Sequence, residues 1–108
     1  MVRGLRGATT VPVNEREAVL KATRELLVAL SKANAIKPAD IAAVIFSSTP
    51  DVNAAFPAAA ARELGWNDVP LFGTQEIDCP TGIPLCIRVL LLLNTDKAQH
   101  ELQPVYLE

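Results

Sequence analysis

Several residue types are scarce in this chain of 108 residues, and each scarcity excludes a class of protein. One histidine and two cysteines are too few for a histidine-rich metal site or for the disulfide framework of a secreted protein. Cys79 and Cys86 do not have a zinc-site spacing, and we expect both to be reduced, small packing residues. Basic residues are not in excess: the net charge is −2, which argues against a general nucleic-acid binder.

Long apolar runs are absent as well. The runs over residues 41–46 and 89–93 are both far shorter than the ~20 residues that cross a bilayer. The opening residues contain no apolar stretch of signal-peptide length. We therefore expect a cytoplasmic protein with neither a membrane nor a nucleic acid as its partner.

Familiar catalytic motifs are also missing. There is no Gly-rich phosphate loop, and Ser47, Ser48 and Thr49 lack the G-x-S-x-G context of a nucleophile, so we interpret them as turn residues. His100 stands in a polar stretch and is expected to be exposed, and no carboxylate cluster indicates a metal site. An enzyme with this inventory does little proton transfer and no covalent or metal chemistry.

Apolar residues, in contrast, are abundant. They make up 50% of the chain, and the mean hydropathy is +0.24. The length corresponds to one domain over residues 1–108. Because such a hydropathy is high for a small monomer, we expect part of the apolar surface to be hidden between subunits.

Hydrophobic periodicity predicts two helices and five strands. Asn14 as a cap, followed by apolar residues at helical spacing, indicates a helix over 15–34. Pro57 and Gly65 mark the start and stop of a shorter helix over 56–65. The expected strands are 2–7, 41–46, 69–72, 87–94 and 105–107. This order predicts an α/β (α+β) domain with a mixed β-sheet.

The strand over 87–94 contains an anomaly, Arg88. Both faces of this strand are apolar, which predicts a central strand that is covered on both sides, with Arg88 on one covered face. A guanidinium cannot shed its proton, so it needs an anionic partner there. Two interpretations stay open: a buried ion pair with an acid such as Glu76 or Asp78, and an anion site whose partner is a ligand.

Two further arginines fit the second interpretation. Arg6 shares a strand face with Gly4, while Arg3 lies on the opposite face, so one of these two arginines can enter a cleft. Arg62 stands near the end of the short helix. Three arginines and one acid that converge would suit a small di-anion with a hydroxyl group.

Short blocks of residues along nearly the whole chain match one known family. They are, in family order, residues 3–11 (RGLRGATTV), 49–51 (TPD), 56–58 (FPA), 62–64 (REL), 75–76 (QE), 86–89 (CIRV) and 105–108 (VYLE). Together they resemble the monofunctional, trimeric chorismate mutases of the Bacillus type. The resemblance implies a pseudo-α/β-barrel homotrimer with three active sites between subunits. It also implies the Claisen rearrangement of chorismate to prephenate, on the route to phenylalanine and tyrosine, without a cofactor.

The same resemblance implies a role for particular positions. Arg88 matches the donor to the ether oxygen, and Glu76 matches the acid that receives the ring hydroxyl. Arg6 matches a grip on a substrate carboxylate. Further substrate contacts are carried over to Arg62, Tyr106, Phe56, Ala58, Ala59 and the backbone of Leu71, Phe72 and Gly73, with Phe56 and Ala58 coming from the adjacent subunit.

The sequence departs from the family pattern in three places. Ala59 stands where some members have a lysine, Gly73 replaces a small side chain, and the family continues past position 108 into a tail that helps to close the site. These departures favour a weaker grip on the substrate and keep an alternative open, a non-catalytic trimeric binder of small anions on the same scaffold. A third hypothesis is another small trimeric α/β enzyme, such as an imine deaminase, whose motifs are not evident.

Overall fold

The computed structural model describes residues 1–107, which form one mixed sheet with two helices. The helices and strands in chain order are β1 (Val2–Thr10), α1 (Arg16–Asn34), β2 (Ile41–Ser48), α2 (Ala58–Glu63), β3 (Leu71–Gln75), β4 (Cys86–Asn94) and β5 (Val105–Tyr106). Two short 3₁₀ turns, η1 (Pro38–Asp40) and η2 (Gln99–Glu101), precede β2 and β5. The predicted α+β class, with a mixed sheet and two helices, is confirmed. Glu108, the last residue of the 105–108 block, lies outside the described residues.

The strand order is β3-β2-β4-β1-β5, so β4 is the central strand, as its apolar sequence predicted. It pairs antiparallel with both neighbours, β1 and β2. The outer pairs, β2 with β3 and β1 with β5, are parallel. Directly paired residues point to the same side of a sheet, so these registers decide which side chains share a face.

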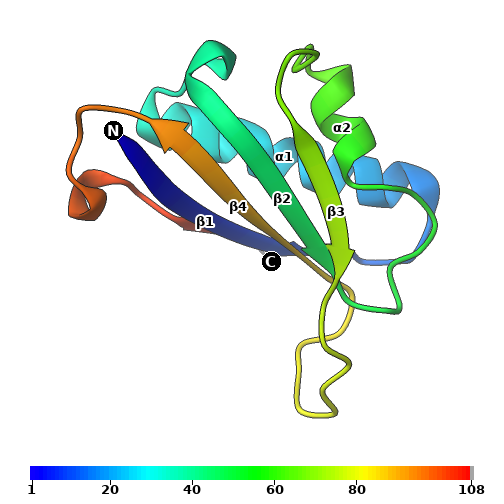
Figure 1. Cartoon of the computed structure of the whole chain (residues 1–108). Coiled ribbons are helices and arrows are strands. Elements are labelled where there is room, and N and C mark those ends of the chain that lie inside the picture. The colour runs from blue at the N-terminus through cyan, green and yellow to red at the C-terminus, as the bar shows by residue number, and fades with distance from the viewer. Residues whose placement is uncertain (108) are drawn as a thin grey trace.

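One face of the sheet is covered by the helices (Figure 1). The buried residues of α1 meet the inward side chains of the strands, among them Leu5, Val44, Phe46 and Leu91. This closeness requires a glycine in β1. A Cβ on Gly7 would lie 2.9 Å from Leu30 Cδ1 and 3.1 Å from the carbonyl oxygen of Val105. The absence of a side chain at Gly7 therefore allows α1 to pack close to the sheet.

The opposite face carries no helix among residues 1–107 (Figure 1). The register puts on this open face the side chains of Arg6, Ala8, Arg88, Leu90, Leu92, Ile45, Ser47, Phe72, Thr74 and Tyr106. Covering of β4 on both sides was therefore a wrong expectation for the single chain. Arg88 projects from the open face, and its side chain is 49% exposed.

Several element ends differ from the expectation, because pairing overrides local propensity. β1 runs on to Thr10, which pairs with Cys86. β2 runs on through Ser47 and Ser48, which pair on both sides, so these serines are strand residues and not turn residues. β3 begins after Pro70, whose missing N–H cannot join a ladder, and extends to Gln75.

The helix ends differ as well. α1 matches the prediction to within one residue, but Asn14 does not cap it: its Oδ1 accepts the N–H groups of Asn53 and Ala54, which ties the chain before α1 to the loop after β2. α2 is shorter than expected. Gly65 has φ +88°, the left-handed conformation of a helix stop, as predicted.

Candidate active site

A cleft of about 850 Å³ opens where β2 ends and β4 begins. Its walls come from three segments: residues 49–51 after β2, the loop over 76–84 between β3 and β4, and Arg88 on β4. Both residues that the sequence singled out as the catalytic pair, Glu76 and Arg88, line this cleft. The cleft lies at the carboxyl end of β2, beside the open face of the sheet.

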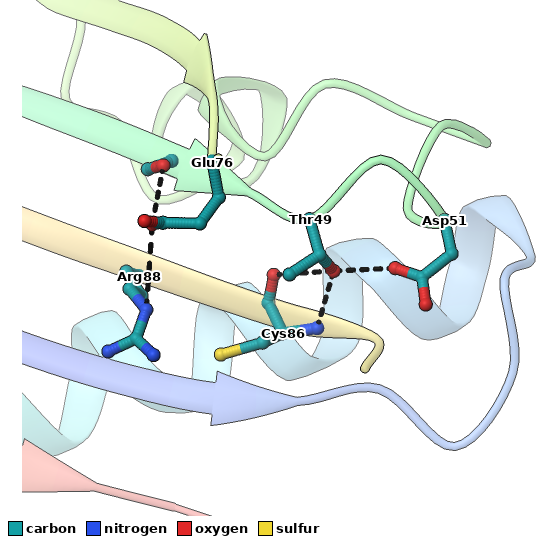
Figure 2. A network of polar contacts seen from close by, with 6 residues as sticks. Thr49, Asp51, Glu76, Cys86 and Arg88 are labelled. Carbon is teal, nitrogen blue, oxygen red and sulfur yellow. Dashed lines mark hydrogen bonds and ion pairs between the residues drawn. The ribbon is translucent and has the colours of Figure 1, made fainter. Parts of the chain in front are cut away.

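Arg88 and Glu76 form an ion pair across the cleft. Arg88 Nε lies 3.5 Å from Glu76 Oε1, and Ser47 Oγ donates a 3.0 Å hydrogen bond to the same oxygen. Figure 2 shows the dashed line that joins Glu76 to Arg88. The side chain of Arg88 is 49% exposed and that of Glu76 is 36% exposed. The pair is thus not the dry, buried one considered from sequence, and at that exposure it stabilises the fold by at most about 1 kcal/mol.

The pair leaves groups available for a ligand. Glu76 Oε2 makes no hydrogen bond within residues 1–107, and the only carboxylate near the Arg88 guanidinium in that range is Glu76. A half-paired guanidinium beside a cleft can still donate to an incoming oxygen, because it carries five N–H donors in a planar fork.

Arg6 adds a second cation to this face. It pairs with Leu90 on β4, while Arg88 pairs with Ala8 on β1, so the two arginines are diagonal neighbours on the same side of the sheet. Tyr106 pairs with Ala8 from β5, which places it on this face too. Arg3, in contrast, lies on the other side, where its Nε donates to the carbonyl of Lys97. Arg6 faces the open side of the sheet, but it does not line the cleft of the single chain.

The remaining sequence-predicted contacts lie elsewhere in the chain. Phe56 precedes α2 and Arg62 lies on it, and both side chains are exposed. Ala59 is half-buried, and Ala58 is buried in the core. Leu71, Phe72 and Gly73 lie on β3, an edge strand of the sheet. None of these residues lines the cleft of the single chain.

The two cysteines differ from each other. Cys86 is buried, as expected, and burial raises the pKa of its thiol. Cys79 is exposed on the wall of the cleft, so it is not a packing residue. A hydrogen bond with the Thr81 hydroxyl lowers the pKa of the Cys79 thiol. His100 is exposed, as predicted.

Sequence reasoning missed three residues at the cleft: Ser47, Thr49 and Asp51. All three were assigned to a turn because serine, threonine and aspartate favour turns. The alternation that placed Ile45 on a strand, continued by two residues, would have put Ser47 beside Arg88. Thr49 and Asp51 belong to the 49–51 block that matches the family, although the resemblance assigned no role to either residue. The carboxylate of Asp51 accepts the Thr49 hydroxyl and the Leu85 N–H, and these bonds lower the pKa of Asp51.

Residues 1–107 contain no group of three or more metal-ligating side chains that could hold an ion. No helix in this range has both the length and the apolarity to cross a membrane. The fold and the cleft define a class: small α+β proteins with a mixed sheet and helices on one face. Beside the other face lies a cleft whose lining contains Arg88 and the acids Asp51, Glu76 and Asp78.

Comparisons with known proteins identify the family within that class. A family model described as chorismate mutase type I matches residues 2–108, and the chain belongs to this family. It is 45% identical over 109 aligned positions to the chorismate mutase AroH of Bacillus subtilis (strain 168), an alignment that covers all of this chain and 86% of that protein. It is 49% identical to the chorismate mutase AroH of Thermus thermophilus, over 99% of this chain and 88% of that one.

The fold agrees with the family. A solved structure of a chorismate mutase from Clostridium thermocellum superposes with a TM-score of 0.94 at 41% sequence identity, and covers 95% of this chain and 92% of that chain. The resemblance noted from the sequence blocks is therefore confirmed at the level of family and fold.

Proposed function

We propose that this protein is an isomerase that rearranges chorismate to prephenate at the cleft beside Arg88. The observation that carries the proposal is the placement of Arg6 and Arg88 on one open sheet face, next to the Glu76 carboxylate, which Ser47 holds by a hydrogen bond. Membership of the chorismate mutase type I family supports it. So does the small inventory of nucleophiles and bases, because a pericyclic step needs neither.

Positioning is the first part of the catalysis. Chorismate carries two carboxylates and a flexible enolpyruvyl side chain, which reacts only when it folds over the ring. Arg6 grips one carboxylate, with Tyr106 and Arg62 in support, and this removes the orientational freedom that slows the reaction in water. Glu76 accepts the ring hydroxyl with Oε2, since Oε1 is already engaged by Ser47 and Arg88.

Charge stabilisation is the second part. The breaking C–O bond leaves partial negative charge on the ether oxygen, and Arg88 donates to that oxygen. This bond is stronger in the transition state than in the ground state, which is the condition for raising the rate. By analogy with oxyanion holes, one such preorganised donor contributes about 3–4 kcal/mol.

A homotrimer completes the site in this proposal. Phe72 and Tyr106 on the open face are 65% and 60% exposed, and Phe56 is 81% exposed. An apolar surface of this kind is typical of a face that a second copy covers. The cleft of each subunit is then closed by residues of its neighbour: Phe56, Ala59, Arg62 and β3. Ala58 is buried in the core of its own chain and supports this wall from behind. Each subunit is a single domain over residues 1–108.

Ala59 and Gly73 leave fewer contacts in the completed site than a lysine and a larger side chain would. We therefore expect a raised KM with an intact reaction. We also place the enzyme in the cytoplasm, a reducing compartment that suits two free cysteines.

Purified protein mixed with chorismate tests the proposal. The diene absorbance of chorismate should disappear at a rate proportional to enzyme concentration, and prephenate should accumulate in equal amount. Binding of prephenate without turnover would instead make the protein a non-catalytic anion binder. Turnover of 2-iminobutanoate in place of chorismate would favour the imine-deaminase alternative.

A further inference from the structure

A network of hydrogen bonds beside the cleft joins the end of β2 to the start of β4 (Figure 2). Thr49 N donates to the carbonyl of Cys86 at 3.0 Å, and Cys86 N donates to Thr49 Oγ1 at 2.9 Å. The Thr49 hydroxyl donates to Asp51 Oδ1 at 2.5 Å. Leu85 N donates to Asp51 Oδ2 at 3.0 Å. One carboxylate thus holds both Thr49 and Leu85.

Leu85 has a backbone conformation that needs such support. Its φ is +49°, in the left-handed region that branched side chains disfavour. Three contacts hold it there: the Asp51 carboxylate on its N–H, the N–H of Val11 on its carbonyl at 2.8 Å, and packing against the small apolar cluster that contains Ile87. Strained residues of this kind gather where a functional group must be placed accurately.

The strained residue lies where it can affect the catalytic pair. Leu85 is the last residue before β4, and Arg88 follows on that strand. Glu76 stands at the other end of the same β3–β4 loop, where its N–H donates to the carbonyl of Ser48. Among residues 1–107, no hydrogen bond or ion pair joins Asp51 to Arg88 or to Glu76, so any effect of Asp51 on the reaction acts through the backbone.

We propose that Asp51 is a positioning residue: its carboxylate clamps Leu85 to Thr49, fixes the first residues of β4, and so aims the Arg88 side chain into the cleft. The proposal rests on the proposed function, because it assigns Asp51 to the transition-state contact that Arg88 makes there. Without the clamp, Leu85 relaxes toward an ordinary φ and Arg88 loses its fixed direction.

Replacement of Asp51 by asparagine tests the clamp. Asp51→Asn should lower kcat about tenfold and leave KM within about twofold, because misplacing Arg88 weakens a contact made mainly in the transition state. Thr49→Val should do the same, and Thr49→Ser should restore kcat to within about twofold, since serine keeps the hydroxyl. Asp68→Asn, at an exposed aspartate outside the cleft, is the matched control and should change neither constant.

The two variants should also act as one unit. If Asp51 and Thr49 form a single clamp, the double variant Thr49→Val, Asp51→Asn loses little more kcat than either single variant. A kcat of Asp51→Asn within about twofold of the unaltered enzyme overturns the inference, as does a loss that appears only in KM. Should Asp51→Asn fail to fold, the Thr49→Val and Thr49→Ser pair decides the matter by the same criteria.

Hydrogen exchange at the Leu85 amide separates failure of the clamp from failure of the proposed function. Faster exchange in Asp51→Asn than in the unaltered protein supports the clamp whether or not chorismate is turned over. Unchanged exchange overturns the clamp even if the enzyme is active. An unaltered protein that does not accelerate the rearrangement overturns the proposed function, and with it the assignment of Asp51 to catalysis.

Discussion

At the scale of single residues, Glu76 has two oxygens in different surroundings. Oε1 is held by the Ser47 hydroxyl at 3.0 Å and lies near Arg88, while Oε2 is left for a ligand. The neighbour of Ser47 on the strand, Ser48, has its side chain on the other face because residues alternate. The two serines therefore form a natural pair for comparing a residue at the site with one outside it.

Ser47→Ala should lower kcat/KM by about fivefold, because loss of one hydrogen bond that orients Glu76 costs about 1 kcal/mol at a half-exposed site. Ser48→Ala, the control, should leave kcat/KM within about twofold. Initial rates with chorismate over a range of concentrations measure both. Equal effects of the two replacements would show that Ser47 does not orient the carboxylate.

The lowered pKa of Asp51 predicts how the stability of the fold depends on pH. The pKa of Asp51 is lowered in the folded protein, by the Thr49 hydroxyl first and then by the Leu85 N–H. Its contribution to stability is therefore fully present above the ordinary value of 3.8 and is lost as pH falls through the lower folded pKa. Thermal melts between about pH 2 and 6 should show a shallower acid decline for Asp51→Asn than for the unaltered protein. Parallel declines would contradict the assignment.

At the scale of elements, the packing of α1 on β1 depends on a glycine. Gly7→Ala places a methyl group 2.9 Å from Leu30 Cδ1, so α1 must move or the core must distort. We expect the free energy of unfolding to fall by about 1–3 kcal/mol, the usual cost of overpacking. Gly73→Ala meets no atom within 4 Å and should change stability little. Urea unfolding of both variants measures the difference in their free energies of unfolding. An unchanged free energy of unfolding for Gly7→Ala would show that Leu30 and α1 can move away from β1 at little cost.

Hydrophobic periodicity was sufficient to predict the elements, their order and the central place of β4, because those properties follow from local patterns. Element ends were not predictable in the same way. Ser47 and Ser48 belong to β2 because strands pair with them on both sides, which no local propensity encodes. Arg88 stood out as an arginine within an apolar strand. The pattern left Glu76 and Asp78 open as its acidic partner, and the family resemblance selected Glu76. The clamp on Leu85 depends on contacts between distant segments and left no trace in the sequence.

At the scale of the whole molecule, the proposed homotrimer brings together residues that lie apart in the single chain. Arg88 lines the cleft, while Arg62 lies on α2, outside it. A trimer in which neighbours complete each other's sites predicts a mass of three 11.6 kDa chains in solution. Light scattering after gel filtration checks this mass. A monomer that is fully active would contradict the shared site.

Hybrid trimers test the sharing directly. Arg88→Ala and Arg62→Ala subunits, each of low activity alone, should regain activity when they are unfolded and refolded together. Random mixing leaves about a quarter of the sites with both arginines intact if the two come from neighbouring subunits. No gain on mixing would place both arginines in the same subunit's site.

The most direct measurement is kcat of Arg88→Ala with chorismate, made beside a thermal melt of the same protein. An arginine that acts in the transition state predicts a fall of about 10²–10³-fold in kcat. Because the half-exposed pair with Glu76 contributes little to folding, Tm should stay within about 4 °C. A kcat within about tenfold of the unaltered enzyme, or a Tm lowered by far more, would show that Arg88 serves the fold and not the reaction.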